Sequence, residues 1–279
     1  MIRCLFLSLC LLLAVGCGSH GVDSLQWMTM GTVAKVSFKD ANRFSFRSLV
    51  TGSSHDRRHL VDVIKAVYDN VERCLSVWNK DSEISRYTSV ENVSPEMRPC
   101  YEAAFRLQKV SGGVFNPFWR GVGTGPDLGG IAKGFAVDLA AEKLKSDDSA
   151  FLKGSGEGLL LDLGGNLKVV SGEWRTGIRN PYGEMRTILL TNGMACATSG
   201  EYERGKHIYD GRTGTVVSNN LVSVTVVHPS SAMLADGLST TLFVLGKEDG
   251  ERFLHEHYPE AEAYWIVKCG RQLLLGCER

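Results

Sequence analysis

Residues 221–246 read LVSVTVVHPSSAMLADGLSTTLFVLG and place a short apolar run directly before a longer one. The run at 221–227 is rich in valine, which is typical of a strand. Pro229 and Ser230 follow it and favour the start of a helix, which we expect to continue to Gly246. His228 ends the strand and is expected to cap this turn. The stretch therefore predicts a strand that leads straight into a helix.

Two oxygen-bearing side chains stand four residues apart in this helix. Asp236 and Thr240 share one helix face at that spacing, so a carboxylate and a hydroxyl lie side by side. Mg2+ and Ca2+ prefer oxygen ligands, often one or two carboxylates completed by water and substrate phosphates. The spacing also suits an aspartate bonded to a backbone amide and a threonine bonded back to its own helix. Both interpretations stay open on spacing alone.

Further helices and strands are predicted on both sides of this unit. Helical spacing of apolar residues predicts helices over 56–76, 101–113 and 131–145. Short strands are expected in 27–38, 158–170, 174–181, 186–200 and 207–217, and a terminal hairpin in 262–268 with 271–277. Because no internal repeat interrupts this order, we expect one mature α+β domain.

The first residues carry an export signal. Arg3 gives a positive start, residues 5–15 are apolar, and a stretch of small residues ends at Cys17. The pattern resembles a bacterial lipoprotein signal, with residues 1–16 removed, Cys17 lipidated and 17–279 forming the mature chain. The alternative is an ordinary secretory signal with an incidental cysteine, and Ala14, where leucine is usual, departs from the lipoprotein pattern. Both interpretations export the protein.

Export permits disulfides without requiring them. The cysteines left after lipidation are Cys74, Cys100, Cys196, Cys269 and Cys277, and none makes a zinc-like spacing. Cys269 and Cys277 either join two neighbouring strands or stay unpaired, because sequence gives no geometry.

Composition argues against a nucleic-acid partner. Lys plus Arg and Asp plus Glu number 31 each, so no basic field attracts nucleic acid. The 31 glycines cluster instead in loops such as GTGPDLGG and LDLGGN, where a backbone turns tightly or approaches a ligand. These loops make a phosphate-bearing ligand a candidate.

Two further positions are candidates for binding and catalysis. DLGGIAKG, residues 127–134, puts two glycines and Lys133 at a helix start, which suits phosphate oxygens, although a plain turn explains it as well. It matches neither the dinucleotide nor the P-loop fingerprint. His207 follows a polar stretch and suits proton transfer from a hydroxyl, whereas a structural or surface histidine is the alternative.

Taken in order, eight motifs resemble those of the ApbE-type FAD:protein FMN transferase family. They are MGT at 30, LSVWNKDSEIS at 75, GGVFNP at 112, DLGGIAKGFAVD at 127, DLGGN at 162, ATSGEYER at 197, HIYDGRTG at 207 and MLADGLSTT at 233. The resemblance covers nearly all of the mature chain. It implies an α+β, T-fold-related single domain with mixed sheets and packed helices. It also implies Mg2+ and FAD as ligands, with FMN attached to a Thr or Ser of an exported acceptor protein and AMP released. The family's periplasmic members imply a lipid-anchored place at the periplasmic face of a membrane.

The resemblance also assigns roles to individual residues. It implies a metal ion between Asp236, Thr240 and the backbone oxygen of Gly130, with Ser239 where some relatives supply another oxygen. It implies His207 as the base. It implies an FAD site lined by Met30, Trp78, Phe115, Asn116, Asp127 and Lys133.

Three positions depart from the family pattern. The family often has aspartate where this chain has Asn116 and Asn166, and proline where it has Gly211. These changes spare the implied metal ligands but put the adenine and ribose contacts in doubt. Two alternative functions stay open: an FAD pyrophosphatase that admits water in place of the acceptor, and a lipoprotein that binds FAD without turning it over.

Overall fold

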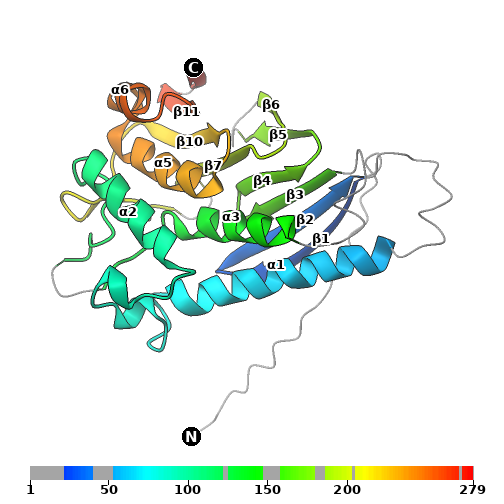
Figure 1. Cartoon of the computed structure of the whole chain (residues 1–279). Coiled ribbons are helices and arrows are strands. Elements are labelled where there is room, and N and C mark those ends of the chain that lie inside the picture. The colour runs from blue at the N-terminus through cyan, green and yellow to red at the C-terminus, as the bar shows by residue number, and fades with distance from the viewer. Residues whose placement is uncertain are drawn as a thin grey trace, which may run out of the picture.

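The computed structural model describes residues 22–39, 53–121, 125–146, 158–179, 186–202, 205–269 and 272–278. Its main element is an eight-stranded sheet with the strand order β1-β2-β3-β4-β7-β10-β11-β12 (Figure 1). The strands are β1 (Val22–Thr29), β2 (Thr32–Lys39), β3 (Gly158–Leu163), β4 (Asn166–Ser171), β7 (Ala195–Gly200), β10 (Leu221–His228), β11 (Glu262–Cys269) and β12 (Gln272–Glu278). The α+β class is confirmed, although every described strand pair is antiparallel rather than mixed in direction.

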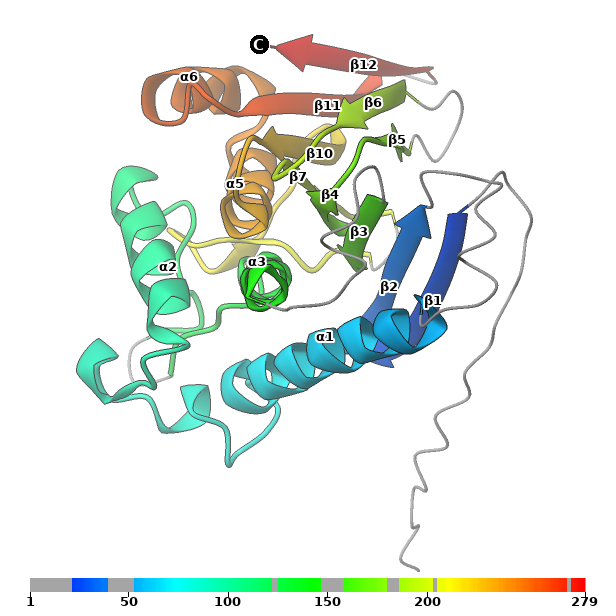
Figure 2. The ribbon, with the colours of Figure 1, turned by 45° about the vertical axis from the view of Figure 1, so that its right-hand side comes forward.

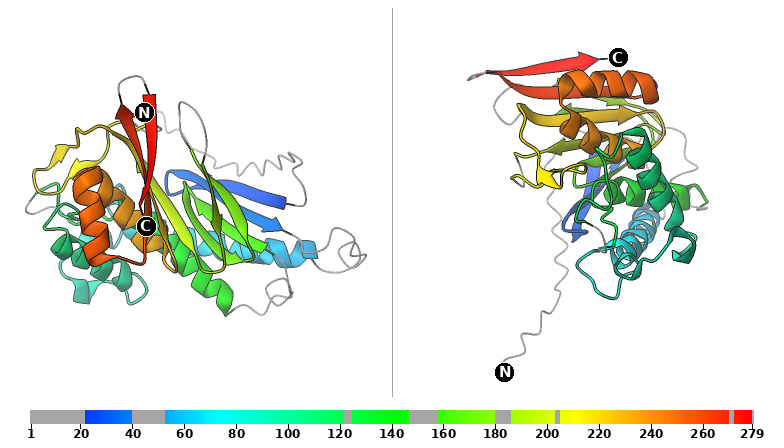
Figure 3. Two further views of the ribbon diagram at one scale, coloured as in Figure 1. Left: turned by 90° about the horizontal axis from the view of Figure 1, so that it is seen from above. Right: turned by 90° about the vertical axis from the view of Figure 1, so that its left-hand side faces the viewer.

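One face of the sheet is covered by helices. The helices are α1 (Ser53–Leu75), α2 (Arg98–Val110), α3 (Ala132–Lys145), α5 (Ala232–Leu245) and α6 (Lys247–His257). Figure 2 shows α3 nearly end-on between α1 and α5, all on the same side of the strands. The large apolar core lies between these helices and the sheet. Figure 3 shows α6 at the far end of this layer, close to β11.

The opposite face of the central strands is covered by a small hairpin. Its strands are β5 (Trp174–Ile178) and β6 (Arg186–Leu190). A second apolar cluster lies between this hairpin and the sheet, where Trp174 and Leu190 meet side chains of β4, β10 and β11. Strand β10 is therefore covered on both faces, and all eight of its residues are buried.

The predicted strand-to-helix unit is confirmed as β10 and α5. The helix begins two residues later than expected, at Ala232, because the Ser231 hydroxyl accepts from the Leu234 N–H and acts as the N-cap. Asp138 on α3 accepts from the next two N–H groups, of Ala232 and Met233. The start of α5 is thus tied to α3, which fixes the position of every later residue on the helix.

The expected opening strand proved to be two strands. Met30 and Gly31 have φ values of 48° and 67°, so the chain reverses there into the β1–β2 hairpin. A non-glycine residue at positive φ is uncommon, and alternation alone gives no sign of it. The other predicted helices and strands are present. They include the short pair β8 (Tyr209–Asp210) and β9 (Thr215–Val216), whereas α6 was not predicted.

Among the described residues, three cysteines are buried and two lie in the terminal hairpin. Cys74, Cys100 and Cys196 are free and buried, and burial raises the pKa of the Cys196 thiol to about 12. In the β11–β12 register Cys269 faces Gln272 and Cys277 faces Tyr264. The two positions lie five residues apart along the ladder, roughly 17 Å, so they cannot pair in this hairpin.

The predictions for residues 1–16 and for Cys17 lie outside the described residues. Among the helices that the structure describes, none combines the length and apolar character needed to cross a membrane.

Candidate functional site

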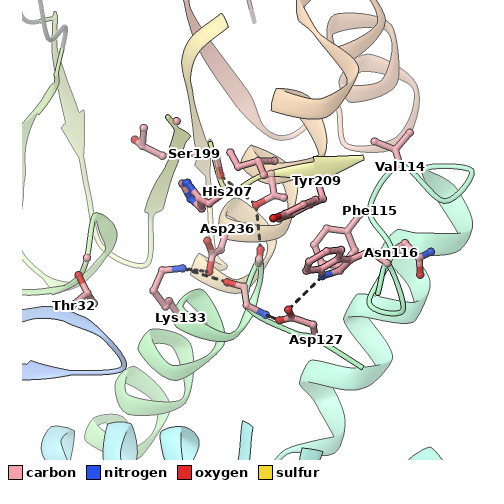
Figure 4. A pocket seen from close by; sticks show the side chains of 18 of the residues that line it. Thr32, Val114, Phe115, Asn116, Asp127, Lys133, Ser199, His207, Tyr209 and Asp236 are labelled. Carbon is pink, nitrogen blue, oxygen red and sulfur yellow. Dashed lines mark hydrogen bonds and ion pairs between the residues drawn. The ribbon is translucent and has the colours of Figure 1, made fainter. Parts of the chain in front are cut away.

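A cavity of about 340 Å³ opens where the start of α3 and the middle of α5 meet the end of β7 (Figure 4). It is lined by Thr32, Val114, Phe115, Asn116, Trp119, Asp127, Gly129, Gly130, Lys133, Gly164, Thr198, Ser199, Gly200, Tyr202, His207, Ile208, Tyr209, Asp236 and Thr240. These residues come from parts of the chain that are far apart in sequence. Eight of the eleven residues implied by the resemblance are among them.

Asp236 is the buried carboxylate of the cavity, with 5% of its surface exposed. Its Oδ2 accepts from the Gly134 N–H at 2.9 Å and lies 3.8 Å from the Lys133 ammonium. Gly134 permits this approach, because a Cβ there would lie 2.2 Å from the Ala232 carbonyl oxygen. The close packing of α3 on α5 therefore holds the carboxylate in place.

Thr240 and Gly130 complete a set of oxygens around Asp236. Thr240 Oγ1 lies 3.4 Å from the Gly130 carbonyl oxygen, one helical turn beyond Asp236. Neighbouring oxygen ligands of one cation lie about 3.0–3.5 Å apart when metal–oxygen distances are about 2.1–2.5 Å. The spacing of these two oxygens is therefore compatible with a shared cation.

The donor set matches an Mg2+-type site better than a transition-metal site. No group of three or more His, Cys, Asp or Glu side chains with metal-binding geometry occurs among the described residues. One carboxylate, one hydroxyl and one carbonyl suit a hard cation that keeps water and phosphate ligands. The residues present fit Mg2+ bound together with a phosphate-bearing substrate.

Two hydroxyls stand behind Thr240. Ser199 Oγ on β7 lies 2.8 Å from Ser239 Oγ and 3.2 Å from Thr240 Oγ1. Ser239 is fully buried, is absent from the cavity lining, and donates to the carbonyl oxygen of Asp236 at 2.9 Å. A direct metal contact of Ser239 stays a prediction, whereas its contact with Ser199 is present.

His207 reaches the cavity from the loop before β8. Its Nδ1 lies 2.7 Å from the Gly205 carbonyl oxygen, which can only accept. The proton of the neutral ring therefore sits on Nδ1, and Nε2 keeps its lone pair. This tautomer suits a base that acts through Nε2.

Aromatic rings and an ion pair form one wall. The Trp119 ring stacks on Tyr209 at a centroid distance of 4.1 Å, and its indole N–H donates to Asp127. The Arg120 guanidinium lies 5.1 Å from the Trp119 ring and 2.8 Å from Asp127 Oδ2. Trp78 is 88% exposed and contacts Arg120 from outside the cavity.

Phe115 and Asn116 link two loops of the site. Asn116 Nδ2 donates to the Gly211 carbonyl at 2.8 Å, and the Gly211 N–H donates to the Val114 carbonyl at 3.0 Å. Asn116 Oδ1 accepts from the Gln108 side chain. The amide thus holds the loop of His207 and Tyr209 against the loop of Phe115.

At the start of α3 three backbone N–H groups have partners within the protein, and binding of phosphate there stays a prediction. The N–H groups of Ala132, Gly134 and Gly129 donate to Leu128, Asp236 and Asp127. Because these donors are used within the protein, the glycine loop shapes the Asp236 and Asp127 sites. The Lys133 side chain supplies the positive charge that lines the cavity.

Met30 and Trp78 are not among the lining residues. The Met30 N–H donates to Glu72 at the β1–β2 turn, and the neighbouring Thr32 lines the cavity instead. A role of Met30 and Trp78 at FAD stays a prediction. Sequence reasoning missed Ser199, Trp119 and Tyr209, although each lies in or beside a quoted motif.

The comparisons with known proteins agree with one another. The model of the ApbE family matches residues 30–123 and 119–265. An FAD:protein FMN transferase of Haemophilus influenzae is 29% identical over 300 residues, covering 81% of this chain and 82% of the relative. One of Vibrio cholerae is 27% identical over 307 residues, covering 86% of each.

Solved structures show the same fold. A histidine-to-glycine mutant of the flavin transferase ApbE from Vibrio cholerae has a TM-score of 0.72 and 25% identity, covering 92% of this chain and 97% of that one. The apo form of the flavinyl transferase ApbE from Pseudomonas stutzeri has a TM-score of 0.70 and 23% identity, covering 92% and 94%.

Proposed function

This chain belongs to the ApbE family, and from that premise we propose that it is an FAD:protein FMN transferase. In the proposed reaction a Thr or Ser hydroxyl of an acceptor protein attacks the FMN phosphorus of FAD. The bond from that phosphorus to the bridging oxygen breaks, a phosphate ester forms, and AMP leaves. The acceptor loses one proton.

One observation carries the mechanism: a hard-cation oxygen set and an imidazole with a free Nε2 lone pair line the same cavity. Asp236, Thr240 and the Gly130 carbonyl would hold Mg2+, which supplies charge stabilisation to the pyrophosphate as the bridging oxygen gains charge. A site that only stored FAD would need no base beside such a set.

His207 is the proposed base. Nδ1 donates to the Gly205 carbonyl, so the ring is oriented and Nε2 can take the proton of the acceptor hydroxyl. Loss of that proton makes the oxygen a better nucleophile as it approaches phosphorus.

Lys133 supports the same reaction from a position beside Asp236. Its ammonium is 3.8 Å from Asp236 and its side chain is only 20% exposed, so it adds positive charge where pyrophosphate oxygens would lie. The stacked rings of Trp119 and Tyr209 offer a flat apolar surface for a ring of FAD.

We also propose that residues 1–16 are a signal and that Cys17 anchors the mature chain to the periplasmic face of a bacterial membrane. The support is the sequence pattern alone. A chain extracted from the membrane whose Cys17 carries no lipid in intact-mass analysis would contradict the anchor.

The test of the function follows three products together. The full chain in detergent is incubated with FAD and Mg2+, with and without an exported redox protein that carries a Ser-Gly-Ala-Thr-like segment. An acceptor heavier by one FMN, with matching AMP, supports the transferase. Free FMN and AMP regardless of acceptor indicate a pyrophosphatase, and intact FAD indicates binding alone.

Asp236→Asn is the matched variant. It keeps the shape of the side chain and an oxygen for the Gly134 N–H but removes the charge. Because a bound divalent ion contributes several kcal/mol, we expect turnover to fall by roughly 100-fold or more. Parental turnover in this variant would refute the metal assignment.

A further inference from the structure

Three hydroxyls from two elements form a continuous hydrogen-bonded chain that begins at the wall of the cavity. Ser239 and Thr240 lie on α5, and Ser199 lies on β7, a strand of the sheet that α5 covers. Ser199 Oγ is 2.8 Å from Ser239 Oγ and 3.2 Å from Thr240 Oγ1. The family resemblance gives Ser199 no role, although it lines the cavity.

The direction of each bond follows from counting protons. A serine or threonine hydroxyl carries one proton and two lone pairs. Ser239 donates its proton to the Asp236 carbonyl oxygen, which can only accept. Ser239 must therefore accept from Ser199.

The same count sets the direction of the next bond. Because the Ser199 proton is directed to Ser239, Ser199 accepts from Thr240. The competing acceptor for the Thr240 proton is the Gly130 carbonyl at 3.4 Å, which is long for an O–H···O bond. The chain thus runs from Thr240 through Ser199 and Ser239 to the backbone of Asp236.

This direction decides which part of the Thr240 hydroxyl faces Gly130 and the cavity. If the proton pointed there, it would repel a cation held by Asp236 and the Gly130 carbonyl. With the proton turned toward β7, a lone pair faces the cavity instead. The arrangement therefore prepares the oxygen to act as a ligand before the cation arrives.

We propose that Ser199, with Ser239 behind it, is a positioning residue that takes the Thr240 proton so that Thr240 offers a lone pair to the divalent cation. This inference rests on the proposed function, since it concerns the same metal site. Ser199 and Ser239 act through Thr240.

Binding of Mn2+ alone to the FAD-free full chain tests the proposal, measured by the loss of the free Mn2+ signal in electron paramagnetic resonance. Outer-shell partners of metal ligands typically change affinity by about 10- to 100-fold, which is the loss expected for Ser199→Ala and for Ser239→Ala. In Ser239→Ala the Ser199 proton loses its acceptor and turns to Thr240, which reverses the chain. Replacing Ser239, a fully buried residue outside the cavity lining, is thereby expected to weaken cation binding.

Two variants separate positioning from a general structural role. Ser199→Thr keeps a hydroxyl and is expected to restore most of the affinity. Thr241→Val removes a buried hydroxyl of the same helix that bonds back to the Gly237 carbonyl, and is expected to leave Mn2+ affinity unchanged. Unfolding temperatures without metal report the intrinsic stability of every variant.

The outcomes distinguish the proposed hydroxyl relay, Thr240 to Ser199 to Ser239, from the proposed function. Ser199→Ala and Ser239→Ala that bind Mn2+ as tightly as the parent overturn the relay, while the parent's flavin transfer leaves the function standing. An equal loss in Thr241→Val also overturns it. If the parent chain transfers flavin but binds no Mn2+, both the relay and the metal assignment are overturned. If it binds Mn2+ normally but transfers no flavin, only the proposed function is overturned.

Discussion

Replacing Gly134 by alanine tests the contact on which the site is built. A Cβ at this position would lie 2.2 Å from the carbonyl oxygen of Ala232 and 2.8 Å from Cβ of Asp236. Optimal contacts between carbon atoms are about 3.5–4.0 Å, so the two helices would have to separate by roughly 1 Å. The obstructing atoms at Ala232 are backbone, which cannot turn aside.

The magnitude follows from two opposing effects. Overpacking typically costs about 1–3 kcal/mol, and a backbone obstacle favours the upper end. Alanine recovers up to about 1 kcal/mol over glycine inside a helix. A net loss of about 2 kcal/mol lowers the unfolding temperature by about 4–8 °C for a chain of this size.

Gly250 on α6 provides the matched control. A Cβ there would meet nothing nearer than 3.4 Å, an ordinary contact with Leu242. Gly250→Ala is expected to raise the unfolding temperature, because only the gain in helix propensity remains. Scanning calorimetry of both variants measures the difference. Equal shifts of the same sign, or a Gly134→Ala chain as stable as the parent, would refute the close-packing argument.

Two further predictions concern histidines. His207→Asn keeps a donor for the Gly205 carbonyl but removes Nε2, so transfer should slow by about 10²- to 10⁴-fold while FAD binding, followed by flavin fluorescence, persists; transfer at the parental rate would exclude His207 as the base. His228 Nδ1 accepts from the N–H groups of Ser230 and Ser231, and burial lowers its pKa, with Lys168 acting in the same direction and Glu260 and Asp138 opposing. The stability that depends on neutral His228 is present above the unfolded-state pKa of about 6.5 and is lost as pH falls through the lower folded-state pKa. His228→Asn keeps the acceptor and should lose less stability to acid in urea titrations at about pH 7.5 and pH 5; identical acid sensitivity of the two chains would contradict this account.

The sequence predicted the parts of the fold that depend on local pattern. β10 and α5 were predicted because an apolar run, a proline and a serine stand in order, and helical spacing of apolar residues located α1, α2 and α3. The β1–β2 hairpin was missed because its turn depends on positive φ at Met30, which side-chain alternation does not reveal. α6 was missed because its few buried residues, Gly250, Phe253 and Leu254, give a weak apolar stripe.

The site was predictable where motif spacing places groups on one helix. Asp236 and Thr240 share a face of α5, the resemblance added Gly130 and the role of His207 as base, and all four line one cavity. Ser199 was not predictable, because its role depends on the distance from β7 to α5. Trp119 and Tyr209 are 90 residues apart, so the sequence does not predict that their rings stack.

The hydrogen bonds that join Asn116, Gly211 and Val114 make positions 116 and 211 depend on each other. An aspartate at 116 has no N–H to offer the Gly211 carbonyl, and a proline at 211 has no N–H for the Val114 carbonyl. Any Cβ at 211 would also lie 2.3 Å from Cβ of Asn116. The two positions are therefore coupled in this chain: an exchange at either one removes a hydrogen bond between the two loops, any side chain at 211 adds a clash, and each change would loosen the loop that carries His207.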